Sequence, residues 1–175
     1  NTHQLELLRD PLYYPDGQIK EEVYEYGSFV QSKMYHQGVS CSDCHNPHSL
    51  KLRANGSDTC LTCHTGEKYQ SKSHHLHSPD SAGSDCISCH MPKKNFMQVD
   101  PRADHRIGIP RPDLTEKIGV PNTCNQCHSD KTAAWASRIL QDHFSTTADA
   151  YQNFGPDLNS INNIKANDWQ MVILF

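Results

Sequence analysis

The eight cysteines of this chain fall into four pairs, each with two residues between its members and a histidine directly after the second. The pairs and their histidines are Cys41/Cys44 with His45, Cys60/Cys63 with His64, Cys86/Cys89 with His90, and Cys124/Cys127 with His128. Two thiols at this spacing can each bond to one vinyl group of a porphyrin, while the adjacent imidazole binds its iron. The four C-x-x-C-H motifs therefore predict four covalently attached haem c groups.

Two other uses of paired cysteines explain the pattern less well. Four C-x-x-C pairs could form two zinc sites of four thiolates each, but zinc has no use for a histidine at the same offset in every pair. Disulfides explain an even number of cysteines in an exported chain, but they do not explain the fixed histidine either. Because the four motifs use every cysteine, we favour haem over both alternatives.

Eight histidines lie outside the motifs and are candidates for the sixth ligand of each iron. They are His3, His36, His48, His74, His75, His77, His105 and His143. Imidazole is a common sixth ligand in electron-transfer haems, so we expect bis-histidine ligation at all four irons, with His36 and His48 among the distal ligands. His48 follows His45 by three residues and is on the wrong side to cap that haem, so we expect it to bind the iron of a neighbouring one. His3 and His143 are more simply explained as structural histidines.

The composition agrees with a core made largely of cofactor. The 175 residues include 9 Gly and 10 Pro, hydrophobic residues are 35% of the total, and the mean hydropathy is -0.73. Such a polar chain buries too few side chains to offset the entropy lost on ordering. We therefore expect sparse regular structure, with the haems supplying much of the core, and an unfolded chain without them.

Charge, hydropathy and cofactor together predict where the protein resides. The formal net charge of -4 argues against a nucleic-acid partner, and no apolar run is long enough to span a bilayer. No signal peptide begins at Asn1, so we expect an exported protein in its mature form. Haem c is attached outside the cytoplasm, where the thiols must stay reduced until attachment. An extracellular or periplasmic location follows.

Three stretches of the sequence resemble the multihaem cytochrome c family related to cytochrome c-554. They run from "DGQIKEEVYEY" to "CLTCH", from "HHLHSPDS" to "IPRPDL", and over "NTCNQCHSDKTAAWA", and together cover residues 16 to 136. The segments "CISCHMPKK", "DHRIG" and "TCNQCHSDKTAAW" are also similar to the last two haems of pentahaem cytochrome c nitrite reductases. That similarity implies that His105 and one residue of the cluster His74, His75 and His77, preferably His77, are distal ligands. Those reductases carry a C-x-x-C-K motif at an open iron, and none occurs here, so no catalytic site is expected.

The elements that position the motifs are predicted to be short. Residues 22–26, "EVYEY", are strand-like, and a short helix is expected over residues 29–36. Residues 41–128 are expected to be haem-wrapping loops, and "SDKTAAWASRILQDHF" an amphipathic helix with Ser129 or Asp130 as N-cap. The apolar side of that helix is predicted to contain Trp135, Ile139, Leu140 and Phe144. The fold class expected is mostly irregular, with a few short helices and minor strands.

Residues 1–144 are predicted to form the tetrahaem domain, and residues 145–175 a polar tail that ends in the apolar stretch "WQMVILF". This strand-prone stretch either closes against its own domain or adds as a strand to another copy of the chain. If the second contact is head-to-tail and does not close into a ring, it produces a filament. The predicted function is electron transfer by hopping between haems, in an extracellular filament. The alternatives are a diffusing periplasmic shuttle and a nitrite or hydroxylamine oxidoreductase with one open iron.

Overall fold

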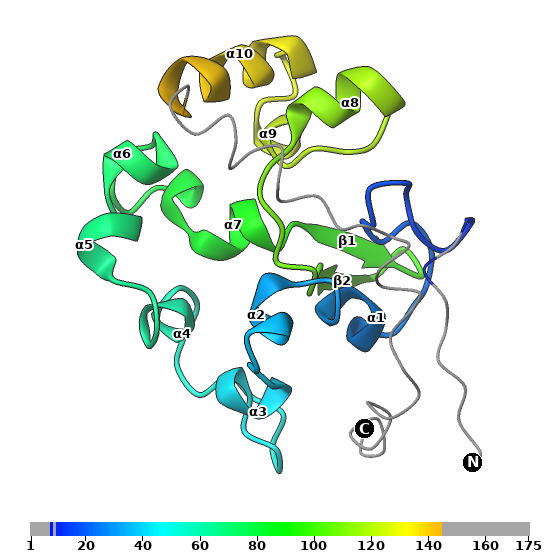
Figure 1. Cartoon of the computed structure of the whole chain (residues 1–175), viewed down its shortest axis with the longest axis vertical. Helices are drawn as coiled ribbons and strands as arrows, with labels where there is room; N and C mark the ends of the chain where they lie inside the picture. The colour runs from blue at the N-terminus through cyan, green and yellow to red at the C-terminus, as the bar shows by residue number, and fades with distance from the viewer. Residues whose placement is uncertain (1–7, 9, 145–175) are drawn as a thin grey trace.

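The structure, a computed structural model, describes residue 8 and residues 10–144 (Figure 1). The helices are α1 Glu25–Phe29, α2 Lys33–His36, α3 Cys41–Cys44, α4 Asp58–Leu61, α5 Gly66–Tyr69, α6 Lys72–His75, the 3-10 turn η1 Ala82–Ser84, α7 Cys86–His90, α8 Pro112–Ile118, α9 Cys124–Cys127 and α10 Ala133–Phe144; the strands are β1 Lys93–Phe96 and β2 Asp100–Ala103. The predicted fold class is therefore confirmed. The predicted tail of residues 145–175, with its apolar strand, and His3 lie outside the described residues.

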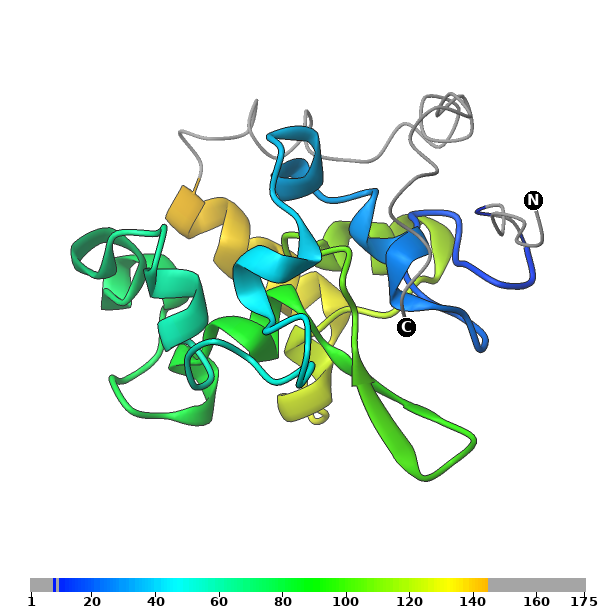
Figure 2. The same ribbon diagram turned by 90° about the horizontal axis from the view of Figure 1, so that it is seen from below.

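A small apolar cluster holds the N-terminal segment against the hairpin. Its buried members are Leu8, Tyr13, Ile19, Val23, Val30 and Phe96. The last of these comes from β1, so the cluster ties Leu8 and residues 13–30 to the middle of the chain. Strands β1 and β2 pair antiparallel with Lys93 opposite Ala103. Figure 2 shows this hairpin extending away from the rest of the molecule.

The prediction of a strand at residues 22–26 is wrong, because helix α1 begins at Glu25. Glu22 and Val23 lie outside any strand, Tyr24 is the extended N-cap of α1, and Glu25 and Tyr26 belong to the helix. Gly27 also lies so close to the hydroxyl of Tyr13 that a β-carbon there would collide with it. The predicted helix over residues 29–36 is interrupted at Ser32, whose extended backbone and side chain cap α2 through a 3.1 Å bond from the Tyr35 N–H.

The C-terminal helix of the described chain is correctly predicted, but its cap and its buried face differ from the prediction. The capping side chain is Thr132 and not the predicted Ser129 or Asp130, because Oγ1 of Thr132 accepts a 3.1 Å hydrogen bond from the Trp135 N–H. The buried residues are Ala136 and Ser137, whereas Ile139 is 39% exposed. The small side chains allow α8 to approach, and Ser137 donates a 2.6 Å bond to Glu116 of that helix. Close helix packing therefore selects the small residues over the large apolar ones.

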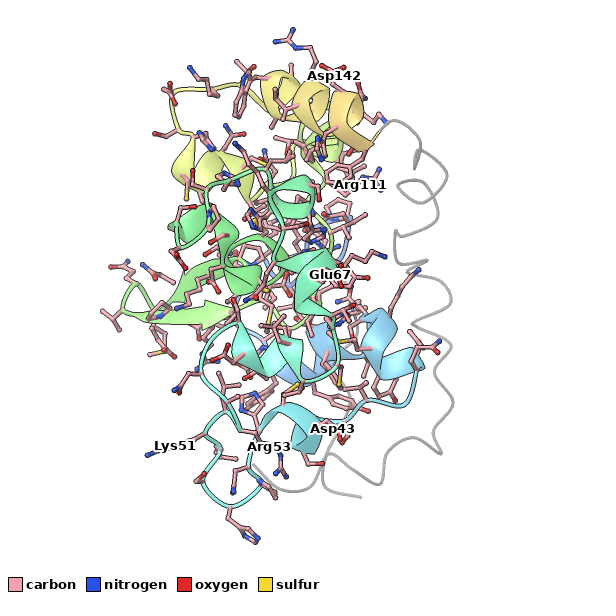
Figure 3. All side chains as sticks on the ribbon, turned by 90° about the vertical axis from the view of Figure 1, so that its left-hand side faces the viewer. Asp43, Lys51, Arg53, Glu67, Arg111 and Asp142 are labelled. Carbon is pink, nitrogen blue, oxygen red and sulfur yellow. The ribbon has the colours of Figure 1, made fainter. Side chains whose placement is uncertain are left out.

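The segment that carries the first three motifs has almost no core of its own. No residue from 33 to 95 is buried. Charged side chains such as Lys51, Arg53 and Glu67 lie along this stretch (Figure 3). This segment is held by turns and hydrogen bonds and not by packed apolar side chains. That agrees with the expectation that haem groups supply its core. No helix in the described part of the chain is long and apolar enough to cross a bilayer.

Candidate haem-binding sites

Each motif forms one helical turn that ends at its histidine. The histidine N–H donates to the carbonyl of the first cysteine, four residues back, at 2.8 Å in the first motif and 2.9 Å in the second and fourth. In the third motif the helix itself continues through His90. Residues three apart on a helical turn project from the same face, so both thiols of a pair can reach one porphyrin. The turn thus supplies two tethers and one axial ligand together.

The second motif departs from this regular pattern at Cys63. Helix α4 ends at Leu61, so Cys63 lies outside it, whereas the other three motif helices contain both of their cysteines. A 3.2 Å bond from the Cys63 N–H to the carbonyl of Cys60 continues the turn, and the exposed Cys63 thiol lies 3.8 Å from Oγ1 of Thr62. Burial raises the pKa of Cys44, and the thiol of Cys63 is among the further causes. Cys63 is therefore close to the first motif, and its attachment to haem stays a prediction.

The four motif turns follow one another along the longest axis of the molecule. Figure 1 shows them in the order α3, α4, α7 and α9, from one end to the other. All eight cysteines are free thiols, so the disulfide alternative is not supported. Within residues 10–144, no three or more His, Cys, Asp or Glu side chains gather as a zinc site requires.

Hydrogen bonds fix the second, third and fourth motifs to one another. Ser57, which precedes α4, donates a 2.7 Å bond to the carboxylate of Asp85 and accepts a 3.1 Å bond from the Cys86 N–H. Thr123, which precedes α9, donates a 2.6 Å bond to the carbonyl of Ser88 inside the third motif. The residues that cap one motif therefore hold the next, which sets the spacing of the attachment points.

The cysteines of the later motifs are also close together. Burial, followed by the nearby thiol of Cys86, raises the pKa of Cys60 to about 11. Burial likewise raises the pKa of Cys89 to about 11, with Cys124 as the next largest cause. The attachment points of the second and third motifs, and of the third and fourth, are thus adjacent.

Three motif histidines each face a second imidazole from elsewhere in the chain. The ring centroids of His45 and His105 are 6.3 Å apart, those of His90 and His74 are 6.0 Å apart, and those of His128 and His77 are 6.0 Å apart. The interplanar angles are 31°, 13° and 32° in the same order. An imidazole nitrogen lies about 2 Å from a first-row metal that it binds, so two rings sharing one ion have centroids about 6 Å apart. The three pairs have the spacing that bis-histidine ligation requires.

Backbone carbonyls orient two of the motif imidazoles. Nδ1 of His45 lies 2.8 Å from the carbonyl of Leu50, and Nδ1 of His90 lies 2.9 Å from that of Gly108. A carbonyl only accepts, so Nδ1 carries the proton in both rings. Nε2 is left with its lone pair for a metal, as expected of a ligating histidine.

Two distal imidazoles are held in the same way. Nδ1 of His105 lies 2.9 Å from the carbonyl of Ala103, and Nδ1 of His77 contacts the carbonyl of His75. Gly83 packs against the His77 ring so tightly that a β-carbon at this position would overlap it. The carbonyl contacts leave Nε2 of both distal histidines free for iron. The close approach to the His77 ring explains why position 83 is a glycine.

His64, the motif histidine of the second site, has different surroundings. Its ring lies edge-to-face with Tyr69 at 5.2 Å, and the same tyrosine lies 5.1 Å from His74. Within residues 10–144, the ring contact of His64 is therefore a phenol rather than a second imidazole. Tyr69 contacts a ligand candidate of the second haem and one of the third.

In the described chain, the rings of the remaining predicted ligands make no stacking or edge contact with a motif histidine. His36 lies edge-to-face with Tyr35 at 5.5 Å, and His48 is exposed in the turn that follows the first motif. His75 accepts a 3.2 Å bond from the N–H of His77. Nε2 of His143 is bonded to the carbonyl of Ser73 at 2.6 Å, which agrees with a structural role.

Sequence reasoning preferred His77 within its cluster and left His74 or His75 as alternatives, whereas the structure places both His74 and His77 beside motif histidines. The aromatic supports Tyr69 and Trp135 were missed, although each follows its motif histidine by only five or seven residues. The Trp135 ring lies 5.1 Å from that of His128. An aromatic residue shortly after a C-x-x-C-H motif is the sequence signal that could have found them.

Comparisons with known proteins support the same interpretation. The family model described as Cytochrome c552 matches residues 67–170, more than half of the chain, and the one described as a doubled CXXCH motif matches residues 34–69. Among solved structures, the crystal structure of the outer cell wall cytochrome OcwA is similar, with a TM-score of 0.52 and 17% sequence identity. The likeness covers 75% of this chain and 40% of that one, so this chain spans less than half of OcwA and the likeness concerns the fold. No curated protein matches the sequence.

The motif turns, the oriented imidazoles and the sparse polypeptide core all fit covalently bound haem c. The motif cysteines would hold the porphyrins and the motif histidines the irons, and the bound haem would supply one-electron redox chemistry. The chain belongs to the cytochrome c552 family and is a multihaem c-type cytochrome.

Proposed function

We propose that this protein transfers electrons by hopping along four closely packed bis-histidine haems, one attached at each motif, and that it catalyses no bond chemistry. The observation that carries the proposal is the set of three imidazole pairs with centroids 6.0–6.3 Å apart. An iron with two protein ligands has no free position for a substrate, so electron exchange is the chemistry left to it.

The pairs assign a ligand set to three of the irons. His45 and His105 hold the first, His90 and His74 the third, and His128 and His77 the fourth. The second iron, bound by His64, takes its sixth ligand from His36 or His48, the two members of the expected distal set His36, His48, His77 and His105 that are not in a pair. The adjacency of Cys60 to Cys86 supports close approach of the second and third haems, and that of Cys89 to Cys124 supports the same for the third and fourth.

The haem content tests this proposal directly. We expect a pyridine haemochrome assay to find four haems per chain, all retained after acid-acetone extraction because thioether bonds attach them. The visible spectrum of the oxidised protein should be that of low-spin iron throughout. Extractable haem, fewer than four haems, or bound zinc in their place would contradict the proposal.

A second candidate function is an oxidoreductase with one open iron. The observation that favours it is the contact of His64 with Tyr69 in place of a second imidazole. In that case the unaltered protein contains one high-spin haem, which binds carbon monoxide when reduced. A fully low-spin protein removes this candidate.

We also propose that the protein is exported and that copies join head-to-tail into an extracellular filament with a continuous haem path. The order of motif turns along the longest axis supports this, because the first and last motif helices, α3 and α9, lie toward opposite ends (Figure 1). The apolar sequence of residues 169–175 is suited to strand addition to a second copy. The outer cell wall location in the name of OcwA supports export.

Deleting residues 169–175 should convert filaments into monomers whose haem spectra are unchanged, because the deletion removes the joining strand and none of the haem ligands. Negative-stain images and sedimentation velocity of the full-length and shortened proteins measure this. Full-length protein that sediments as a monomer at high concentration would contradict the filament and favour a diffusing periplasmic shuttle.

A further inference from the structure

The carboxylate of Asp85 lies at the junction of the second and third motifs. Asp85 is the N-cap residue of α7 and directly precedes Cys86. It accepts a 2.7 Å hydrogen bond from Ser57, the residue that precedes the helix of the second motif. It also accepts a 3.1 Å bond from Ser88, between the two cysteines of the third. One side chain therefore contacts both motifs.

The surroundings of this carboxylate keep it negatively charged. Burial opposes its ionisation, but the hydroxyls of Ser57 and Ser88 and the backbone N–H groups of Ile87 and Ser88 outweigh burial and lower its pKa. None of the ion pairs in the described part of the chain includes Asp85. Its charge is held by neutral donors and is not cancelled by a cation.

The charge acts on the attachment points of both motifs. Asp85 is among the groups that raise the pKa of Cys60 in the second motif, after burial and the thiols of Cys86 and Cys44, and of Cys89 in the third, after burial and the thiol of Cys124. Because these sulfurs would bond to the porphyrin edges, the carboxylate would lie near both attachment points. Asp85 is partly buried, so solvent and salt screen its charge less than that of an exposed residue.

The other motif helices have no carboxylate at this position. Their N-cap residues are Ser40, Ser57 and Thr123, all neutral. A serine satisfies the cap as well as an aspartate does, so capping alone does not call for a charge at the third motif. The acidic side chain therefore suggests an electrostatic role beyond helix capping.

We propose that Asp85 is a fixed negative charge that lowers the reduction potentials of the haems attached at the second and third motifs. Reduction adds one electron to each iron, and a nearby negative charge stabilises the more positive oxidised state. The middle of the haem chain thereby holds electrons less tightly than it would without this residue. The inference rests on the proposed attachment of one haem at every motif.

Potentiometric titration of the holoprotein, followed in the visible spectrum, tests this with Asp85→Ser and Asp85→Asn. Serine is the N-cap residue of the first two motif helices, and asparagine keeps the shape of the side chain. We expect two of the four midpoint potentials to rise in both variants. The ratio of reduced to oxidised haem at a fixed potential should increase threefold to tenfold, where tenfold equals about 59 mV for a one-electron couple.

Asp58→Asn is the matched control, because Asp58 begins the helix of the second motif, is exposed, and loses the same charge. We expect its midpoint potentials to stay near those of the unaltered protein. Unchanged midpoints in both Asp85 variants, an equal rise in Asp58→Asn, or loss of haem from both Asp85 variants would overturn the inference. A count below four haems in the unaltered protein contradicts the proposed function instead, so the two failures are distinguishable.

Discussion

Replacing His105 with alanine should convert one of the four proposed haems from low-spin to high-spin. The imidazole of His105 faces His45 at 6.3 Å, and its Nδ1 is fixed on the Ala103 carbonyl, so Nε2 is the atom that the iron of the first haem would lose. An alanine cannot replace this ligand, and the iron becomes five-coordinate or takes a water. Visible and electron paramagnetic resonance spectra of the oxidised variant measure the change. The reduced variant should also bind one carbon monoxide per chain.

His143→Ala is the matched control for this experiment. His143 is an exposed histidine outside the motifs, and its Nε2 is already bonded to the carbonyl of Ser73. Its removal should leave all haems low-spin and carbon monoxide binding unchanged. An unaltered spectrum in His105→Ala would remove His105 from the ligand set and with it the pairing of His45 and His105.

The chain without haem should fail to fold cooperatively. No residue from 33 to 95 is buried, and the apolar cluster of the described chain is made by the N-terminal segment together with Phe96. Ordering each backbone residue costs about 1–2 kcal/mol, and this long segment has no packed side chains to offset it. Far-ultraviolet circular dichroism of the haem-free chain should show mostly disordered backbone and no thermal transition, whereas the holoprotein should unfold cooperatively.

Limited proteolysis locates the effect within the chain. Cleavage in the haem-free protein should concentrate between residues 33 and 95, and the holoprotein should resist the same protease. The holoprotein, reduced and oxidised, serves as the control because its sequence is identical. A cooperative transition in the haem-free chain, or equal resistance of both forms, would show that the polypeptide supplies its own core.

Secondary structure was predictable where a pattern in the neighbouring residues specifies it. The amphipathic helix that became α10 was predicted because its pattern extends over several turns, but its cap at Thr132 and its buried face of Ala136 and Ser137 depend on how closely α8 packs. The expected strand at residues 22–26 failed for the same reason. Glu25 and Tyr26 belong to α1, whose Gly27 packs against the hydroxyl of Tyr13, and a short window of sequence does not contain that contact.

The sequence by itself determined the chemistry of this protein, because a C-x-x-C-H motif holds two tethers and one iron ligand within five consecutive residues. The distal ligands are far from their motifs in the chain, and no spacing rule links His45 to His105 or His128 to His77. Only the tertiary structure brought these imidazoles together, placed His74 beside His90, and set Asp85 between two motifs. A covalent tether needs only neighbours in sequence, whereas a shared iron ion or a shared charge depends on proximity that folding alone creates.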